Sequence, residues 1–191
     1  MTTEGPSELK RFVMIDRDGT IIKECHYLSD PDQVEIIPGA IESLLGFREM
    51  DLGLVVITNQ SGLGRGLFGH EDLEQVHGRL VELLADEGIL LDGLYFCPHS
   101  PDVECDCRKP RTGMVEQAAH DLNFLPEQGF VVGDRVADMR LGENVGATTF
   151  LVRTGYGRAT EKEGRVEPGF VVDSIREAVP IIADLLVPMR S

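Results

Sequence analysis

The chain has 191 residues, 42% of them hydrophobic and 27% charged, which is an ordinary composition for one soluble globular domain. Its 33 acidic and 18 basic side chains leave a formal net charge of −15. Nucleic acids and anionic membranes both require a basic footprint, so we expect neither as a partner. No apolar stretch approaches the length of a membrane span, and residues 1–10 lack the apolar core of a secretory signal. We therefore expect a cytoplasmic monomer with a single domain over residues 1–191.

Short apolar runs alternate with helical patterns along the chain, which predicts an α/β fold with a parallel sheet. Strands are expected at residues 12–16, 54–58, 94–97, 130–133, 148–152 and 170–172. Apolar residues at helical spacing predict helices within 41–50, 73–84, 115–122 and 137–145. A capping box at Ser174 and Glu177 starts a final helix, and the glycine-rich stretch 155–169 is expected to be a loop.

The first strand delivers two carboxylates, Asp16 and Asp18, into a glycine turn. Ligands of open parallel sheets bind where the strands end, so both residues should lie at a ligand crevice. Two carboxylates this close repel each other unless a cation neutralises them, and Mg²⁺ prefers carboxylates together with phosphate oxygens. One Asp could then attack phosphorus while the other handles a proton. The alternative is a loop whose acidic residues simply face water.

The second strand ends in Thr58 and Asn59, which can donate to phosphate oxygens without adding charge. Glycines at 62, 64 and 66 let the backbone approach an anion closely. Ordinary turn chemistry explains the same residues. Arg65, between these glycines, is either a substrate clamp or a solvent-facing residue.

The fourth strand delivers Asp134 to the same edge of the sheet. Asp134 would complete a magnesium site with Asp16 and the backbone carbonyl of Asp18, or it is a helix N-cap. Asp138 is expected to favour the dipole at the start of the next helix.

Two adjacent cations, Arg108 and Lys109, precede a proline. An ammonium near a transferring phosphoryl group offsets the charge on its oxygens, and the guanidinium fork suits a phosphate or hydroxyl. Taken singly, they would be ordinary surface cations.

Cys97, His99, Cys105 and Cys107 fall within eleven residues and supply a complete tetrahedral set for Zn²⁺. Four protein ligands leave no open position, so such a zinc is predicted to be structural and to brace the segment that carries Lys109. A redox pair or chance clustering is the alternative. Cys25 lies outside the set and is expected to be a free thiol.

The motifs occur in the order Asp-x-Asp-Gly-Thr, Thr-Asn, Lys-Pro and Gly-Asp-x-x-x-Asp. This combination resembles the haloacid dehalogenase-like phosphatase superfamily. The resemblance implies a Rossmann-like sheet of order 3-2-1-4-5 without a large cap domain. It also implies that Asp16 is the nucleophile that forms an aspartyl-phosphate and that Asp18 is the general acid and then the base. Thr58 and Lys109 would hold the phosphoryl group, and Asp134 would bind Mg²⁺.

The segment 97–107, which holds the four predicted zinc ligands and is called the zinc loop below, and the run from Asn59 to Phe68 make the resemblance more specific. Both resemble the heptose bisphosphate phosphatase family, whose sister family is histidinol-phosphate phosphatase. The implied activity is Mg²⁺-dependent removal of the C7 phosphate of D-glycero-D-manno-heptose 1,7-bisphosphate, a small phosphorylated sugar. The resemblance implies substrate contacts at Glu24, Cys25, His26, Tyr27, Thr58, Asn59, Gln60, Ser61, Arg108, Lys109 and Arg135. Glu24-Cys25-His26 departs from the family's usual pattern. The alternatives are histidinol-phosphate hydrolysis and a non-catalytic, zinc-stabilised binding module.

Overall fold

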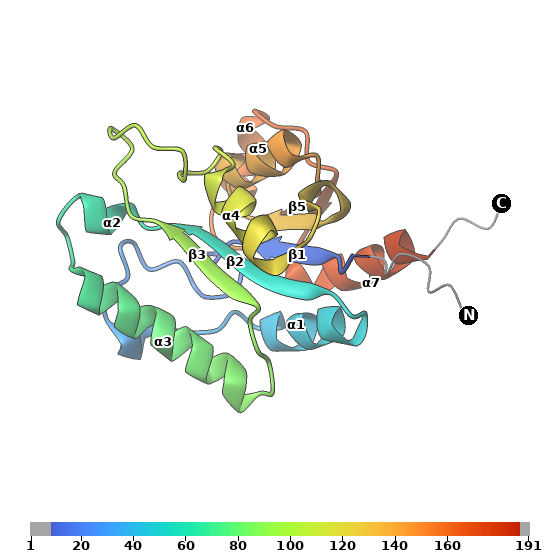
Figure 1. The fold of residues 1–191 in the computed structure, drawn as a ribbon, viewed down its shortest axis with the longest axis horizontal. Coiled ribbons are helices and arrows are strands. Elements are labelled where there is room, and N and C mark those ends of the chain that lie inside the picture. Colours follow the sequence, from blue (N-terminus) through green and yellow to red (C-terminus); the bar gives the residue numbers. More distant parts are fainter. Residues whose placement is uncertain (1–8, 188–191) are drawn as a thin grey trace, which may run out of the picture.

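Six parallel strands form one sheet in the order β3-β2-β1-β4-β5-β6 (Figure 1). The computed structural model describes residues 9–187, so most of the polar N-terminal segment lies outside the described residues. The strands are β1 Phe12–Ile15, β2 Gly53–Asn59, β3 Gly93–Cys97, β4 Phe130–Gly133, β5 Thr148–Val152 and β6 Phe170–Val172. The expected order 3-2-1-4-5 is confirmed, and β6 extends it at the β5 edge.

The central strand β1 lies between β2 and β4, and its side chains are buried on both faces of the sheet. Phe12 and Met14 pack into one hydrophobic cluster, whereas Val13 and Ile15 pack into the other. The alternation follows from the two-residue period of a strand. A continuous apolar run therefore marks a fully covered parallel strand.

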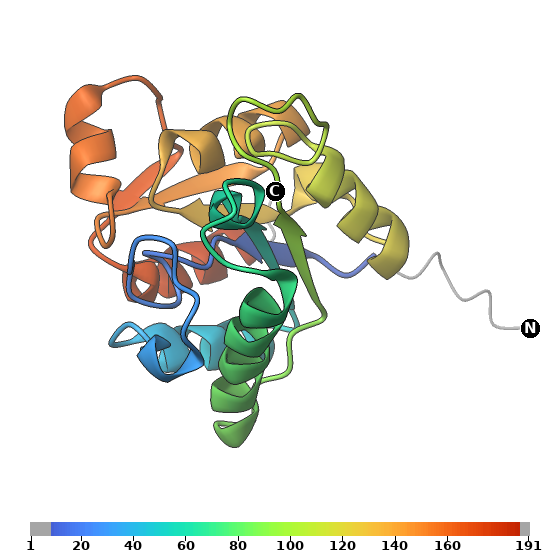
Figure 2. The same ribbon diagram turned by 90° about the vertical axis from the view of Figure 1, so that its left-hand side faces the viewer.

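Helices cover both faces of the sheet (Figures 1 and 2). On one face lie α1 Ala40–Glu49, α3 His70–Asp86 and α7 Ile175–Leu186, and on the other lie α4 Gly113–Leu122 and α5 Val136–Val145. All five expected helices are present, with ends that differ from expectation by a few residues. Among residues 9–187, no helix combines the length and the apolarity that a membrane crossing demands.

The expected loop over 155–169 is partly wrong, because residues Gly157–Glu163 form the helix α6. The glycines on either side favoured a loop, but the run between them, Arg-Ala-Thr-Glu-Lys-Glu, consists largely of helix-forming residues. Gly164 ends the helix with a left-handed φ of 61°, which glycine adopts at little cost.

Parallel pairing places the carboxyl ends of β1, β2 and β4 at one edge of the sheet. Ile15, the last residue of β1, is in register with Val56 of β2 and Val132 of β4. The polar residues that follow these strands, Asp16 and Asp134, and Thr58 near the end of β2, therefore emerge side by side.

Candidate active site

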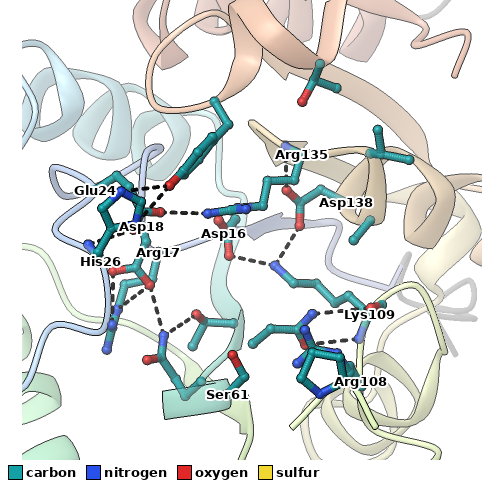
Figure 3. A pocket seen from close by; sticks show the side chains of 18 of the residues that line it. Asp16, Arg17, Asp18, Glu24, His26, Ser61, Arg108, Lys109, Arg135 and Asp138 are labelled. Atoms are coloured by element: carbon teal, nitrogen blue, oxygen red, sulfur yellow. Dashed lines mark hydrogen bonds and ion pairs between the residues drawn. The ribbon is translucent and has the colours of Figure 1, made fainter. Parts of the chain in front are cut away.

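A cavity of about 590 Å³ opens at the carboxyl edge of the sheet, a typical size for a small-molecule site (Figure 3). Asp16, Asp18, Thr58 and Lys109 line it together, although the last lies more than ninety residues beyond the first. The fold therefore brings these four distant residues to one cavity.

Lys109 is the buried centre of the cavity floor. Its Nζ donates to Asp16 Oδ1 at 2.6 Å and to the Ile57 carbonyl at 2.7 Å, and it lies 2.6 Å from Asp138 Oδ1. Burial alone would lower the pKa of this ammonium, but the two carboxylates outweigh burial and raise it. Lys109 is therefore held as a cation beside the carboxylate of Asp16.

Three buried carboxylates, from Asp16, Asp134 and Asp138, bring oxygens within 4.8 Å of one another. Asp134 Oδ1 is fully buried and has no hydrogen-bond partner among the described residues. With Lys109 as the adjacent cation, three ionised carboxylates would leave two negative charges, which one divalent ion balances. This oxygen-only donor set fits Mg²⁺.

The crowding of these carboxylates also shifts the pKa values of Asp16 and Asp134. Burial, followed by repulsion from Asp138 and Asp18, raises the pKa of Asp16 from an ordinary 3.8 to about 7, despite the opposing effect of Lys109. Burial and repulsion from Asp16 and Asp138 raise the pKa of Asp134 from 3.8 to about 8. A cation at this point would relieve both effects.

Two glycine turns and one backbone amide orient Asp134. The amide of Tyr156 donates to Asp134 Oδ2 at 2.6 Å. Gly19 and Gly155 have positive φ values, and a Cβ on either would lie within 2.3 Å of Asp134 Oδ2. Glycine is therefore required on both sides of this carboxylate.

Asp18 is held by a buried network. Arg17, only 1% exposed, donates through Nε to Asp18 Oδ2 at 3.1 Å and through Nη2 to Oδ1 at 3.0 Å. Gln60 donates to Asp18 Oδ2 at 2.9 Å and to Thr58 Oγ1 at 2.8 Å. The general-acid candidate and the phosphate-clamp candidate are thus linked through one amide.

Asn59 ties the end of β2 to the segment that carries the two adjacent cations. Its amide donates to the Lys109 carbonyl at 3.2 Å, and its Oδ1 accepts from the Lys109 amide at 3.0 Å. Arg108 lines the cavity and donates to the His99 carbonyl at 3.2 Å. Asn59 therefore positions Lys109. The sequence predicted only a substrate contact for Asn59 and not this role.

The expected zinc ligands converge beside this segment. His99 Nδ1 lies 3.3 Å from Cys107 Sγ and 3.6 Å from Cys97 Sγ, which lies 3.8 Å from Cys105 Sγ. Ligand atoms of a tetrahedral zinc site with bonds near 2.3 Å are about 3.8 Å apart, so the donor set fits this ion. Burial raises the pKa of Cys97 to about 12, and a cation is what would hold it as a thiolate.

Four side chains that line the cavity, from Glu24, His26, Arg135 and Tyr156, form a cluster at its rim. Figure 3 shows the first two on the side away from Arg108. Arg135 pairs with Glu24 at 3.0 Å and lies over the Tyr156 ring at 3.8 Å, and the Tyr156 hydroxyl lies 3.0 Å from His26 Nδ1. Of the other expected contacts, Tyr27, Ser61 and Gln60 line the cavity, as does Arg65. Cys25 does not line it, and its side chain packs against the hydrophobic core instead.

Sequence reasoning missed three residues of this site. Asp138 was expected only at the helix start, where its Oδ2 does accept from the Arg135 amide at 3.0 Å, but its other oxygen pairs with Lys109. Arg17 and Tyr156 have no role in the site that the sequence predicts. The place of Arg17 between two predicted catalytic aspartates is its sequence signal, whereas Tyr156 has no such signal.

The sequence and the fold of this chain are similar to those of known phosphatases. A family model described as HAD-hydrolase-like matches residues 106–178. The D-glycero-beta-D-manno-heptose-1,7-bisphosphate 7-phosphatase of Pasteurella multocida is 38% identical over 184 residues, covering 93% of this chain and 99% of that protein. The protein of the same name from Escherichia coli K12 is 38% identical, covering 86% and 90%. The crystal structure of D,D-heptose 1,7-bisphosphate phosphatase from B. bronchiseptica, complexed with magnesium and phosphate, superposes with a TM-score of 0.85 at 30% identity, covering 92% of this chain and 99% of that one.

Proposed function

The chain belongs to the family of D-glycero-beta-D-manno-heptose-1,7-bisphosphate 7-phosphatases, within the haloacid dehalogenase-like superfamily, and on that premise we propose that it removes the C7 phosphate of this bisphosphate. One observation of the site carries the proposal. Lys109 joins Asp16 and Asp138 in a buried ion-pair cluster at the floor of a cavity that Asp18 also lines. The β anomer is proposed from the names of the relatives.

The first step transfers the phosphoryl group to the enzyme. A carboxylate oxygen of Asp16 forms a bond to phosphorus while the bond from phosphorus to the C7 oxygen breaks. Asp18 gives its proton to that oxygen, so the sugar leaves as an alcohol. Thr58 and Lys109 stabilise the charge on the phosphoryl oxygens.

The second step releases phosphate. Asp18, now ionised, accepts a proton from a water molecule whose oxygen attacks phosphorus. The bond between phosphorus and Asp16 breaks, which regenerates the carboxylate. Asp16, Asp134 and the backbone carbonyl of Asp18 would hold a Mg²⁺ ion, which supplies neutralising charge to the carboxylates and the phosphoryl oxygens.

The substrate is tested by comparing two phosphate esters. We expect the purified enzyme with Mg²⁺ to show a kcat/KM at least about 100-fold higher for the heptose bisphosphate than for histidinol phosphate, since contacts along the sugar add to transition-state binding. Phosphate release measured under matched conditions decides this. A preference for histidinol phosphate would assign the chain to the sister activity, and failure to hydrolyse either ester would contradict the proposal.

Magnesium binding is expected to depend on pH through Asp16 and Asp134. Their pKa values are raised from 3.8 to about 7 and about 8, so between pH 4 and 8 the folded metal-free protein holds protons that the unfolded chain has lost. Stability therefore falls as pH rises through this window. We expect the Tm of chelator-treated protein to drop by several degrees from pH 5 to pH 8, since each kcal/mol lowers Tm by about 2–4 °C at this size.

The matched control for this titration is Asp134→Asn, which removes one of the crowded charges. Its metal-free Tm is expected to change less between pH 5 and pH 8 than that of wild type. Added Mg²⁺ should raise the wild-type Tm more at pH 8 than at pH 5, and should raise that of the variant less. Equal effects of Mg²⁺ on both proteins would contradict Asp134 as a ligand.

A further inference from the structure

Among residues 9–187, Gln60 is the one side-chain amide that contacts both Asp18 and Thr58. It follows β2, is only 5% exposed, and lies on the cavity wall. Its Nε2 donates to Asp18 Oδ2 at 2.9 Å and to Thr58 Oγ1 at 2.8 Å. An amide nitrogen carries two hydrogens, and both are used here within the protein. Its nitrogen is therefore committed to these two side chains.

This arrangement fixes the direction of the Thr58 hydroxyl. An amide nitrogen cannot accept, so the hydroxyl oxygen accepts from Gln60 and its own hydrogen is free for another acceptor. The reversed amide would set its oxygen against the carboxylate of Asp18, which is unfavourable. Gln60 therefore leaves Thr58 as a donor toward the cavity.

The same amide divides the two oxygens of Asp18. Within the part of the chain that the structure describes, Oδ2 accepts from both Gln60 Nε2 and Arg17 Nε, whereas Oδ1 accepts only from Arg17 Nη2. A proton on Asp18 occupies the oxygen with more free lone-pair capacity, which is Oδ1. Without Gln60, both oxygens would accept one bond each and this bias would vanish.

We propose that Gln60 is a positioning residue that directs the acid proton of Asp18 to Oδ1 and the hydroxyl hydrogen of Thr58 to the phosphoryl group. The inference rests on the proposed function. In the transfer step, the proton on Asp18 Oδ1 passes to the leaving sugar oxygen as its bond to phosphorus breaks and the bond from Asp16 forms.

Leaving-group dependence separates this role from simple structural support. The proposed test compares Gln60→Met, which keeps the side-chain volume, with wild type on two substrates. The heptose bisphosphate needs a proton on its leaving alkoxide, whereas p-nitrophenyl phosphate releases a phenolate that needs none. We expect the single-turnover rate to fall about 100-fold on the sugar phosphate and no more than about tenfold on the aryl phosphate, through Thr58 alone.

The Asp18→Asn background provides the matched control. There Gln60→Met is expected to slow both substrates by the same factor, because the acid that Gln60 directs is gone. An unchanged Tm for Gln60→Met shows that the fold is intact, and Gln60→Leu serves if Met perturbs it. If Gln60→Met slowed both substrates equally in wild type as well as in the Asp18→Asn background, this inference would be overturned and the proposed function would stand. Absence of turnover by wild type would overturn the proposed function as well.

Discussion

An Asp16→Asn variant is expected to release phosphate from the heptose bisphosphate at least about 10⁴-fold more slowly than wild type. The amide keeps an oxygen that can accept from Lys109 Nζ, which lies 2.6 Å from Asp16 Oδ1 in the native site, so the substitution removes the nucleophile with little change of shape. Because the covalent step depends on this one carboxylate, the neighbouring groups cannot replace it. Continuous phosphate release with excess Mg²⁺ measures the loss.

The loss should be specific to position and not to the removal of a negative charge. Asp86→Asn changes an exposed carboxylate at the end of α3 in the same way and is expected to retain wild-type turnover. The Tm of metal-free Asp16→Asn should not fall at pH 8, since one of three crowded carboxylates has gone. A variant that keeps more than about a tenth of wild-type activity would refute Asp16 as the nucleophile.

The polar residues at the strand ends could be predicted from the sequence, because the topology of a parallel sheet determines where they meet. Asp16 and Asp134 follow apolar runs that read as parallel strands, and Thr58 lies at the end of another. Parallel strands put their carboxyl ends at one edge, so the three polar residues had to meet there. Strand bounds were predicted within one residue for the same reason, since short β-rich runs between turn residues leave little choice.

The side-chain partners were not predictable in the same way. The pairing of Asp138 with Lys109 depends on the rotation of α5 about its axis and on where the zinc loop places Lys109. Neither is encoded in a local pattern. Arg17 illustrates a second limit. A charged residue in a turn is expected to face water, yet Arg17 is 1% exposed and its guanidinium donates to Asp18.

The rim of the cavity shows the third limit. Glu24, His26, Arg135 and Tyr156 come from three segments that no sequence period links, and their contacts arise only once the sheet has formed. A family resemblance implied Glu24, His26 and Arg135 as substrate contacts but gave no reason for Tyr156, which also orients Asp134 through its amide. Specificity residues on loops are set by tertiary packing and not by propensity.

Loss of zinc is expected to cost both stability and turnover, because the predicted zinc loop, residues 97–107, braces the segment that carries Lys109. A Cys105→Ser variant should lose about 3–5 kcal/mol of the free energy of unfolding and about one zinc per chain. Turnover should fall at least about tenfold at a temperature where the protein remains folded, since Arg108 donates to the His99 carbonyl and Gly64 packs against the backbone of Pro98 and Ser100. Denaturant titration, metal analysis and steady-state kinetics measure the three effects.

Cys25→Ser is the matched control, because Cys25 is also partly buried but lies outside the cluster. It should retain zinc and lose no more than about 1 kcal/mol. A strong chelator should reproduce the Cys105→Ser phenotype in wild type, and zinc added afterwards should restore turnover when Mg²⁺ is held constant. The expected reason is geometric: four protein ligands would leave a bound zinc no open position, so it would affect turnover through the position of Lys109. Without zinc, Lys109 should contact Asp16 and Asp138 less well. If chelated protein kept its melting temperature while losing activity, the metal would instead act on the chemistry directly.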